Sequence, residues 1–330
     1  MKQAGRIFYL TVGRPTSGGQ QVNEEHVVAL RALGVDAQLL QWPRNANSAT
    51  PATDRDDPSV WPVWDTAAPL MRFTSAEVLR PNDTVVVPEP WRMQLRAFAN
   101  WPVGRVVHCQ NPYYMFHGTP TLPALAEAGY AHILSCSRYT SQLIRQCGWT
   151  GGLHTVAPQI DPVFTPTDTA GGLQRQLQVA FMPRKRAIEA IFLQGLFRAL
   201  YPQWAHVPWV ALDGISRAEC AARMRSSAVF ASLSHLEGLG LPPLEAMASG
   251  CLVAGFTGGG GGDYATPSNG FWAADGDHEG FCLAVNEALR CASTPAWADE
   301  VRAASATAVA AHAPEAFQRD LLAAWTEILS

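Results

Sequence analysis

The stretch Glu237-Gly-Leu-Gly-Leu-Pro-Pro-Leu-Glu245-Ala-Met-Ala-Ser-Gly250 carries more structural information than any other part of this chain. Gly238 and Gly240 form a loop whose backbone N–H groups can approach an anionic ligand. An apolar, alanine-rich helix follows, and we expect it to begin near Pro242 with Glu245 in its first turn. The positive end of this helix favours an anion at the same place. A phosphate held by backbone, with a carboxylate on each side for sugar hydroxyls, fits a nucleotide sugar.

The residues around the two glutamates resemble the E-G-[FL]-G-L-x-x-x-E-A-M-A-x-G signature of the retaining, family-4 (group 1) glycosyltransferases. This resemblance implies an α/β chain of the GT-B fold, with two Rossmann-like domains facing across a cleft. It also implies that Glu245 accepts hydrogen bonds from ribose hydroxyls and that Glu237 holds hydroxyls of the transferred sugar. The other interpretation is a capped, buried helix whose two glutamates serve only the helix dipole.

The composition is that of a globular chain long enough for two domains. The 330 residues are 48% hydrophobic and 16% charged, and their net charge of −4 does not favour a nucleic-acid partner. No apolar run reaches ~18 residues and no signal-peptide pattern is present, so we expect a cytoplasmic protein without stable membrane insertion. Seven scattered cysteines without a C-x-x-C pair favour neither disulfides nor a zinc site.

Strand-like and helix-like segments alternate along both halves of the chain, as is typical of α/β domains. The resemblance assigns residues 1–168 to an N-terminal Rossmann-like domain that binds the acceptor. Residues 169–330 become a C-terminal Rossmann-like domain that binds the donor. Residues 165–172, rich in Thr, Pro, Gly and Asp, are the expected linker. By the same resemblance, the last helix, at about 315–329, packs back on the N-terminal domain.

Arg184 and Lys185 follow the first strand expected in the second half. Ligands of open α/β sheets bind beyond the carboxyl ends of the strands, where cations can neutralise a diphosphate and stabilise it as a leaving group. The resembled family has an arginine and a lysine near this place. A solvated basic helix start is the alternative, but a helix N-terminus disfavours cations.

Three glycine-containing loops are expected to face the donor. The resemblance assigns the backbone amides of Gly238, Leu239 and Gly240 to the diphosphate. Five consecutive glycines at residues 258–262 follow a buried-strand pattern and resemble a family segment that faces the donor phosphates; a plain flexible linker is the alternative. In the first half, Gly19 lies in a glycine loop after the first strand, where the family has a turn facing the diphosphate.

Weaker candidates lie in a polar loop of the first half and beside Glu237. Pro112 fits a histidine-containing triplet of the family, which puts Gln110 where the histidine that holds the donor sugar would stand, with Asn111 next to it. A nearby histidine is the alternative. Tyr113 is expected either to stack on an acceptor or to pack in the core. His235 is expected either to touch the donor sugar or to cap the turn.

The resemblance implies an enzyme that moves a sugar from a nucleoside-diphosphate sugar to an acceptor hydroxyl with retention of configuration. Glu237, Arg184 and Lys185 carry the catalytic roles, mainly by positioning and electrostatics. We expect no metal and no cofactor besides the nucleotide sugar, and the acceptor is a glycan, a glycolipid or a small molecule. The alternatives are an epimerase or phosphorylase of the same fold, and a catalytically silent nucleotide-sugar-binding or scaffold protein.

Overall fold

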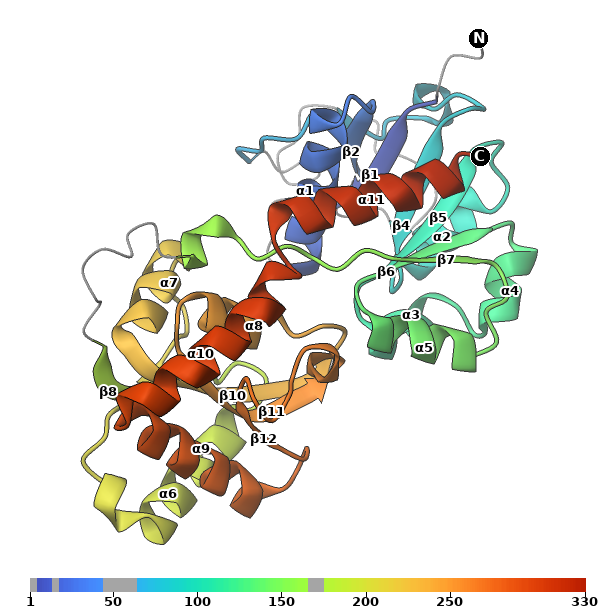
Figure 1. Cartoon of the computed structure of the whole chain (residues 1–330). Coiled ribbons are helices and arrows are strands. Elements are labelled where there is room, and N and C mark those ends of the chain that lie inside the picture. The colour runs from blue at the N-terminus through green and yellow to red at the C-terminus, as the bar shows by residue number, and fades with distance from the viewer. Residues whose placement is uncertain (1–4, 14–17, 44–63, 166–174) are drawn as a thin grey trace. The chain divides into compact units, whose positions relative to one another are not determined.

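The computed structural model describes residues 5–13, 18–43, 64–165 and 175–330. The chain divides into two compact units, each a parallel sheet flanked by helices (Figure 1). Unit 1 combines Met1–Ala157 with Phe317–Ser330, and unit 2 is Pro158–Ala316. Alternating strand and helix patterns produce this architecture because each crossover helix covers a face of the sheet. Among the described residues, no helix has the length and apolar character needed to cross a membrane.

Unit 1 is built on a seven-stranded parallel sheet in the order β3-β2-β1-β4-β5-β6-β7. Its two central strands, β1 and β4, are apolar runs buried along their whole length, because helices cover both faces of the sheet. The strands are β1 (Ile7–Thr11), β2 (Ala37–Gln41), β3 (Leu70–Arg72), β4 (Thr84–Pro88), β5 (Gly104–Cys109), β6 (His132–Ser135) and β7 (Gly152–Thr155).

The helices of unit 1 include the last helix of the chain, α11 (Pro314–Ile328), which lies along its sheet (Figure 1). Phe317, Leu321 and Trp325 of α11 join the buried cluster around β1, and Trp325 Nε1 donates to the hydroxyl of Tyr9 at 3.2 Å. These apolar residues recur every four positions and give α11 one buried face. The other helices are α1 (Gly18–Ala32), α2 (Arg92–Phe98), α3 (Met115–Gly118), α4 (Leu122–Glu127) and α5 (Arg138–Gln146), with 3₁₀ turns η1 (Ala76–Val78) and η2 (Pro112–Tyr114).

Unit 2 is built on a five-stranded parallel sheet in the order β12-β11-β10-β8-β9. The strands are β8 (Gln176–Phe181), β9 (Trp209–Ala211), β10 (Ser227–Glu237), β11 (Leu252–Gly259) and β12 (Phe271–Ala273). The helices are α6 (Ala187–Leu200), α7 (Arg217–Ser226), α8 (Leu241–Ala248), α9 (His278–Ala292) and α10 (Pro295–Ala310), with 3₁₀ turns η3 (Pro162–Phe164), η4 (Pro202–Trp204) and η5 (Gly260–Asp263).

The boundary between the units lies earlier than the expected one after residue 168. It follows Ala157, because the next residues bond to unit 2. Ile160 N donates to the carbonyl of His312 at 2.9 Å, and Arg225 Nη1 donates to the carbonyl of Val163 at 2.6 Å. Of the expected linker, residues 166–172 lie outside the described residues.

Candidate active site

A cavity of about 260 Å³ opens at the carboxyl ends of β8, β9 and β10 in unit 2. This is the edge at which open parallel sheets bind ligands, because the connections after the strands converge there. The lining residues come from the connections after β8 and β9, from α7, α8 and β10, and from η3. They are Phe164, Met182, Arg184, Lys185, Leu212, Asp213, Gly214, Ile215, Arg217, Cys220, Phe230, Leu233, Ser234, Glu237, Pro242 and Glu245.

Lys185 and Glu237, two of the expected donor ligands, meet in this cavity. Nζ of Lys185 lies 2.7 Å from Oε1 of Glu237 and donates to the carbonyl of His235 at 3.2 Å. The two side chains keep 31% and 21% of their surface exposed, so a ligand can reach both. Arg184 lines the cavity from the same connection. This arrangement offers cations to phosphate oxygens and an acceptor to sugar hydroxyls.

A bulge in β10 brings Glu237 to the cavity. Ser234 of β10 pairs with Thr257 of β11, and Glu237 pairs with Gly259. Two residues of β10 therefore lie opposite one residue of β11 between these pairs, which is a β-bulge. Inside the bulge, Leu236 has a φ of 49° and is the single non-glycine residue with positive φ in the described part of the chain. The left-handed conformation costs a residue with a Cβ about 1–2 kcal/mol.

Glu245, the expected ribose ligand, lines the same cavity but is only 7% exposed. Burial raises the pKa of its carboxyl to about 7, the Arg217 guanidinium opposes this rise, and the Asp161 carboxylate adds to it. Arg217 Nη2 lies 3.3 Å from Oε1 of Glu245, and Arg217 Nε lies 3.1 Å from Oδ2 of Asp161. One cation therefore holds two carboxylates, one of them on the cavity wall.

Arg217 is a cavity residue that the sequence patterns did not single out. It is the first residue of α7, after the N-cap Ser216, where the helix dipole disfavours a cation. A cation at a helix N-terminus also indicates a ligand role for Arg184 and Lys185. The same feature of the sequence therefore indicates Arg217.

The loop before α8, residues 238–240, is fixed by a hydrogen bond to its main chain. Gly240 is the N-cap of α8 with a φ of 87°, and its carbonyl accepts a hydrogen bond from the hydroxyl of Tyr264 at 2.6 Å. The side chain of Leu239 is buried in the unit, at 5% exposed. Gly238 and Leu239 therefore have only main-chain atoms to offer a ligand, and neither residue lines the cavity.

The start of α8 differs from the expected one. The helix begins at Leu241, so Glu245 lies in its second turn rather than its first. Pro242 and Pro243 have no backbone N–H, so the first four positions of the helix offer only the amides of Leu241 and Leu244. The expected anion site of helix amides is therefore weaker than that of a helix without prolines, and the cations of the cavity become more important.

Packing explains two members of the run of five glycines after β11. A Cβ on Gly258 would lie 2.8 Å from Cβ of Ser234, and a Cβ on Gly260 would lie 2.2 Å from the carbonyl oxygen of Gly238. Both glycines are required because this segment packs directly against the loop around Glu237. At Gly262 a Cβ would meet nothing within 4 Å.

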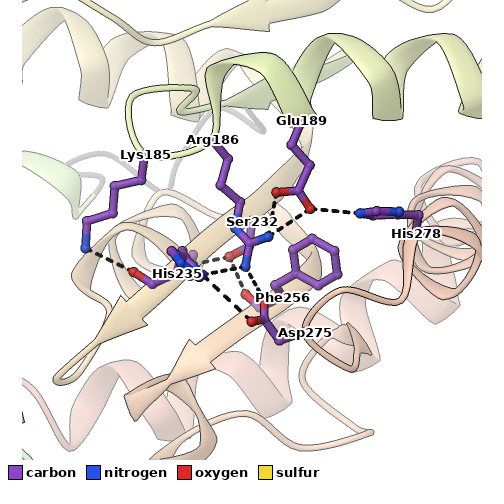
Figure 2. A network of polar contacts seen from close by, with 9 residues as sticks. Lys185, Arg186, Glu189, Ser232, His235, Phe256, Asp275 and His278 are labelled. Atoms are coloured by element: carbon purple, nitrogen blue, oxygen red, sulfur yellow. Dashed lines mark hydrogen bonds and ion pairs between the residues drawn. The ribbon is translucent and has the colours of Figure 1, made fainter. Parts of the chain in front are cut away.

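Arg186, the residue after Lys185, is the centre of a polar network (Figure 2). Its side chain is 8% exposed, and Nη1 donates to both carboxylate oxygens of Glu189 at 2.8 and 2.6 Å. Nη2 donates to Nδ1 of His235 at 2.8 Å and to the carboxylate of Asp275. The guanidinium carbon lies 4.9 Å from the centre of the Phe256 ring. The side chain of His235 therefore belongs to this network and not to the lining of the cavity.

The structure brings Gly19 and Gln110 together in unit 1. Gly19 lies in the first turn of α1, not in a loop, because the helix begins at Gly18. A Cβ on Gly19 would lie 2.5 Å from Oε1 of Gln110, so the glycine leaves room for that side chain. Gln110 Nε2 donates to Oδ1 of Asn23 at 2.8 Å, and Nδ1 of the buried His108 lies 2.8 Å from the same oxygen. Gln110 is thus fixed at the end of β5.

Asn111 is the N-cap of η2, and Tyr113 lies within it. Asn111 Oδ1 accepts a hydrogen bond from the backbone N–H of Tyr113 at 3.1 Å, and the backbone N–H of Asn111 donates to Oε1 of Glu89 at 3.1 Å. Glu89 is a residue that the sequence patterns missed; burial raises the pKa of its carboxyl to about 7. Tyr113 is 37% exposed, and its hydroxyl lies 2.5 Å from that of Tyr139. Tyr113 is therefore a surface residue rather than a core residue.

Comparisons with known proteins find one family model and one relative. Residues 210–302 match the family model described as glycosyl transferases group 1. An α-1,6-glucosyltransferase of Actinobacillus pleuropneumoniae serotype 7 is 29% identical over 294 residues, which are 86% of this chain and 83% of that protein.

Solved structures share the fold over almost the whole chain. Sucrose-phosphate synthase from Thermosynechococcus elongatus superposes with a TM-score of 0.70 at 14% identity, covering 98% of this chain and 99% of that one. Anabaena HepE in complex with UDP gives 0.69 at 13% identity, with coverages of 98% and 100%. These likenesses confirm the expected fold class of two Rossmann-like units.

Proposed function

We infer that this chain, a group 1 glycosyltransferase of the GT-B fold, transfers glucose from UDP-glucose to an acceptor hydroxyl with retention of configuration. The observation that carries this proposal is the convergence of Lys185, Glu237, Arg217 and Glu245 on one cavity at the carboxyl edge of a parallel sheet. The choice of donor is supported by the name of the relative, an α-1,6-glucosyltransferase, and by the structure of HepE in complex with UDP-glucose.

In the proposed mechanism, ionised Glu245 accepts hydrogen bonds from the ribose hydroxyls and Glu237 accepts them from the glucose hydroxyls. Lys185 and Arg184 neutralise the diphosphate as the glycosidic bond breaks, where negative charge grows on the leaving oxygen. The acceptor attacks from the face that the diphosphate leaves, and a phosphate oxygen takes its proton. Glu237 acts through position and charge rather than as a nucleophile.

We assign acceptor recognition to unit 1, with Gln110, Asn111 and Tyr113 as contact residues and Gly19 as the residue that makes space for Gln110. The firm anchoring of Gln110 by Asn23 supports this assignment, because a recognition group needs a fixed position. A saccharide hydroxyl is the proposed nucleophile, in line with the name of the relative.

We propose that transfer needs no divalent metal. Two Asp-x-Asp triplets occur in the chain: the first, residues 54–56, lies outside the described residues. In the second, Asp275 is bound by Arg186, and Asp277 caps α9 by accepting from the N–H of Gly280 at 2.8 Å. Both carboxylates thus have structural roles, while Lys185 is available for the phosphates.

The proposed function is tested by incubating the protein with UDP-glucose and a panel of saccharides, with and without EDTA. We expect UDP release coupled to a glucosylated product, unchanged by EDTA, whose anomeric proton in NMR shows the configuration of the donor. E237Q should lose most of this activity. A product of opposite configuration, or activity that EDTA abolishes, would contradict the mechanism, and wild-type protein that binds UDP-glucose but transfers nothing would favour a silent binding protein.

A further inference from the structure

The bulge that presents Glu237 is held in a strained conformation. Leu236 has a φ of 49°, in a region that side chains with a Cβ avoid, and it lies directly between His235 and Glu237. The side chain of Leu236 is 41% exposed, so its own burial does little to stabilise this conformation. Such strain persists only where neighbouring contacts fix the backbone on either side.

His235 is fixed from two directions by consecutive residues of the chain. Lys185 Nζ donates to its carbonyl at 3.2 Å, and Arg186 Nη2 donates to its ring Nδ1 at 2.8 Å (Figure 2). A guanidinium can only donate, so this hydrogen bond requires Nδ1 of His235 as the acceptor; the same Nδ1 lies 3.7 Å from Oδ2 of Asp275. The contact of Arg186 therefore depends on a defined tautomer of His235.

The guanidinium of Arg186 is itself held from several sides. Glu189 of α6 takes two hydrogen bonds from it, Asp275 beyond β12 takes another, and Phe256 of β11 lies against its face. Glu189 is in turn bonded to Nε2 of His278 on α9 at 3.0 Å. This network ties the end of β10 to α6, α9 and β11, and all of these elements belong to unit 2.

We propose that Arg186 is a positioning residue: by holding His235 it maintains the left-handed bulge at Leu236 and so keeps Glu237 turned toward the donor. The inference rests on the proposed role of Glu237 in binding the sugar. Without Arg186 the bulge relaxes to a right-handed or extended backbone, and the carboxylate of Glu237 leaves Lys185 and the cavity.

The test is a rescue experiment, because a glycine at position 236 removes the strain that Arg186 must oppose. R186M should lower kcat for UDP-glucose by at least about tenfold, since displacements of about 1 Å cost as much as a hundredfold. R186M/L236G should return to within about threefold of the wild-type value. R186M/L236A is the matched control, because alanine also lacks the leucine side chain but keeps the Cβ and its strain; it should stay as slow as R186M.

A second pair of variants guards against a folding defect in R186M. H235A removes the ring contacts of His235 with Arg186 and Asp275, and it leaves Arg186 bound to Glu189 and Asp275. H235A should lower kcat as R186M does, and H235A/L236G should restore it. The melting temperatures of these variants should not change in parallel with kcat. Failure of L236G to rescue either variant, or equal rescue by L236A, would overturn the proposal.

Crystal structures separate this inference from the proposed function. R186M should show residue 236 at negative φ and Glu237 away from Lys185, while R186M/L236G should keep the 2.7 Å contact between Lys185 and Glu237. If wild-type protein transfers no glucose but these structures behave as stated, the proposed function fails and the positioning role stands. If R186M keeps the bulge unchanged, the positioning role fails regardless of activity.

Discussion

Replacing Glu245 by glutamine should stabilise the protein while it weakens nucleotide binding. The carboxyl is almost completely buried, and its pKa rises from 4.5 to about 7 because burial outweighs the attraction of Arg217. One pKa unit corresponds to about 1.4 kcal/mol, so the ionised carboxylate costs the folded state about 3 kcal/mol at pH 8. Glutamine has nearly the same shape and carries no charge, so E245Q avoids this cost.

The sign of the effect follows from proton binding. Between the unfolded pKa of 4.5 and the folded pKa of about 7, the folded state keeps a proton that the unfolded chain releases. The free energy of unfolding contributed by this group therefore falls as the pH rises through that window and is level above it. The advantage of E245Q over wild type should be below about 1 kcal/mol at pH 5 and reach about 3 kcal/mol at pH 8.

Urea unfolding of both proteins at pH 5 and pH 8 measures this difference. The matched control is E219Q, because Glu219 is exposed on α7 and forms a surface pair with Arg223 at 2.7 Å. That variant should stay within about 0.5 kcal/mol of wild type at both pH values. The reasoning would be refuted if E245Q were no more stable than wild type at pH 8. It would also be refuted if the stability difference between the two proteins were as large at pH 5 as at pH 8.

Three further outcomes are expected. K185M should weaken UDP binding at least about tenfold in calorimetry, since a hydrogen bond to a charged group contributes about 1.5–3 kcal/mol; unchanged affinity would exclude Lys185 from the phosphate site. G258A should lower the melting temperature and abolish UDP binding, because its Cβ would clash with Ser234 and His235 of β10, while G262A should change neither; equal behaviour of the two would contradict the packing argument. Q110A should leave UDP affinity unchanged but raise the KM of the acceptor, and an unchanged KM would remove Gln110 from acceptor recognition.

Local sequence patterns predicted the architecture and part of the site. Short apolar strands that alternate with amphipathic helices predict two parallel sheets. Cations directly after a strand predict a site for an anionic ligand, and this pattern involves only residues that are neighbours in sequence. For this reason the sequence alone locates Lys185, Glu237 and Glu245, and the structure places these three residues in one cavity.

The residues that were missed act through partners far away in the chain. Arg217 meets Glu245 28 positions later, and Arg186 meets His235 49 positions later. Leucine rarely adopts positive φ, so no sequence pattern indicates the bulge at Leu236. The sequence predicts that α8 starts near Pro242, because proline is common at the first helical position. In the structure the helix starts one residue earlier, at Leu241.

Titration of UDP into the wild-type protein by calorimetry, next to E245Q and the control E219Q, tests the central claim most directly. The cavity beyond β8 and β10 should bind one UDP per chain, with affinity at least about tenfold lower in E245Q and unchanged in E219Q. Binding that is equally strong in all three proteins would place the nucleotide elsewhere, and no binding to wild type would contradict the assignment of this cavity as the donor site.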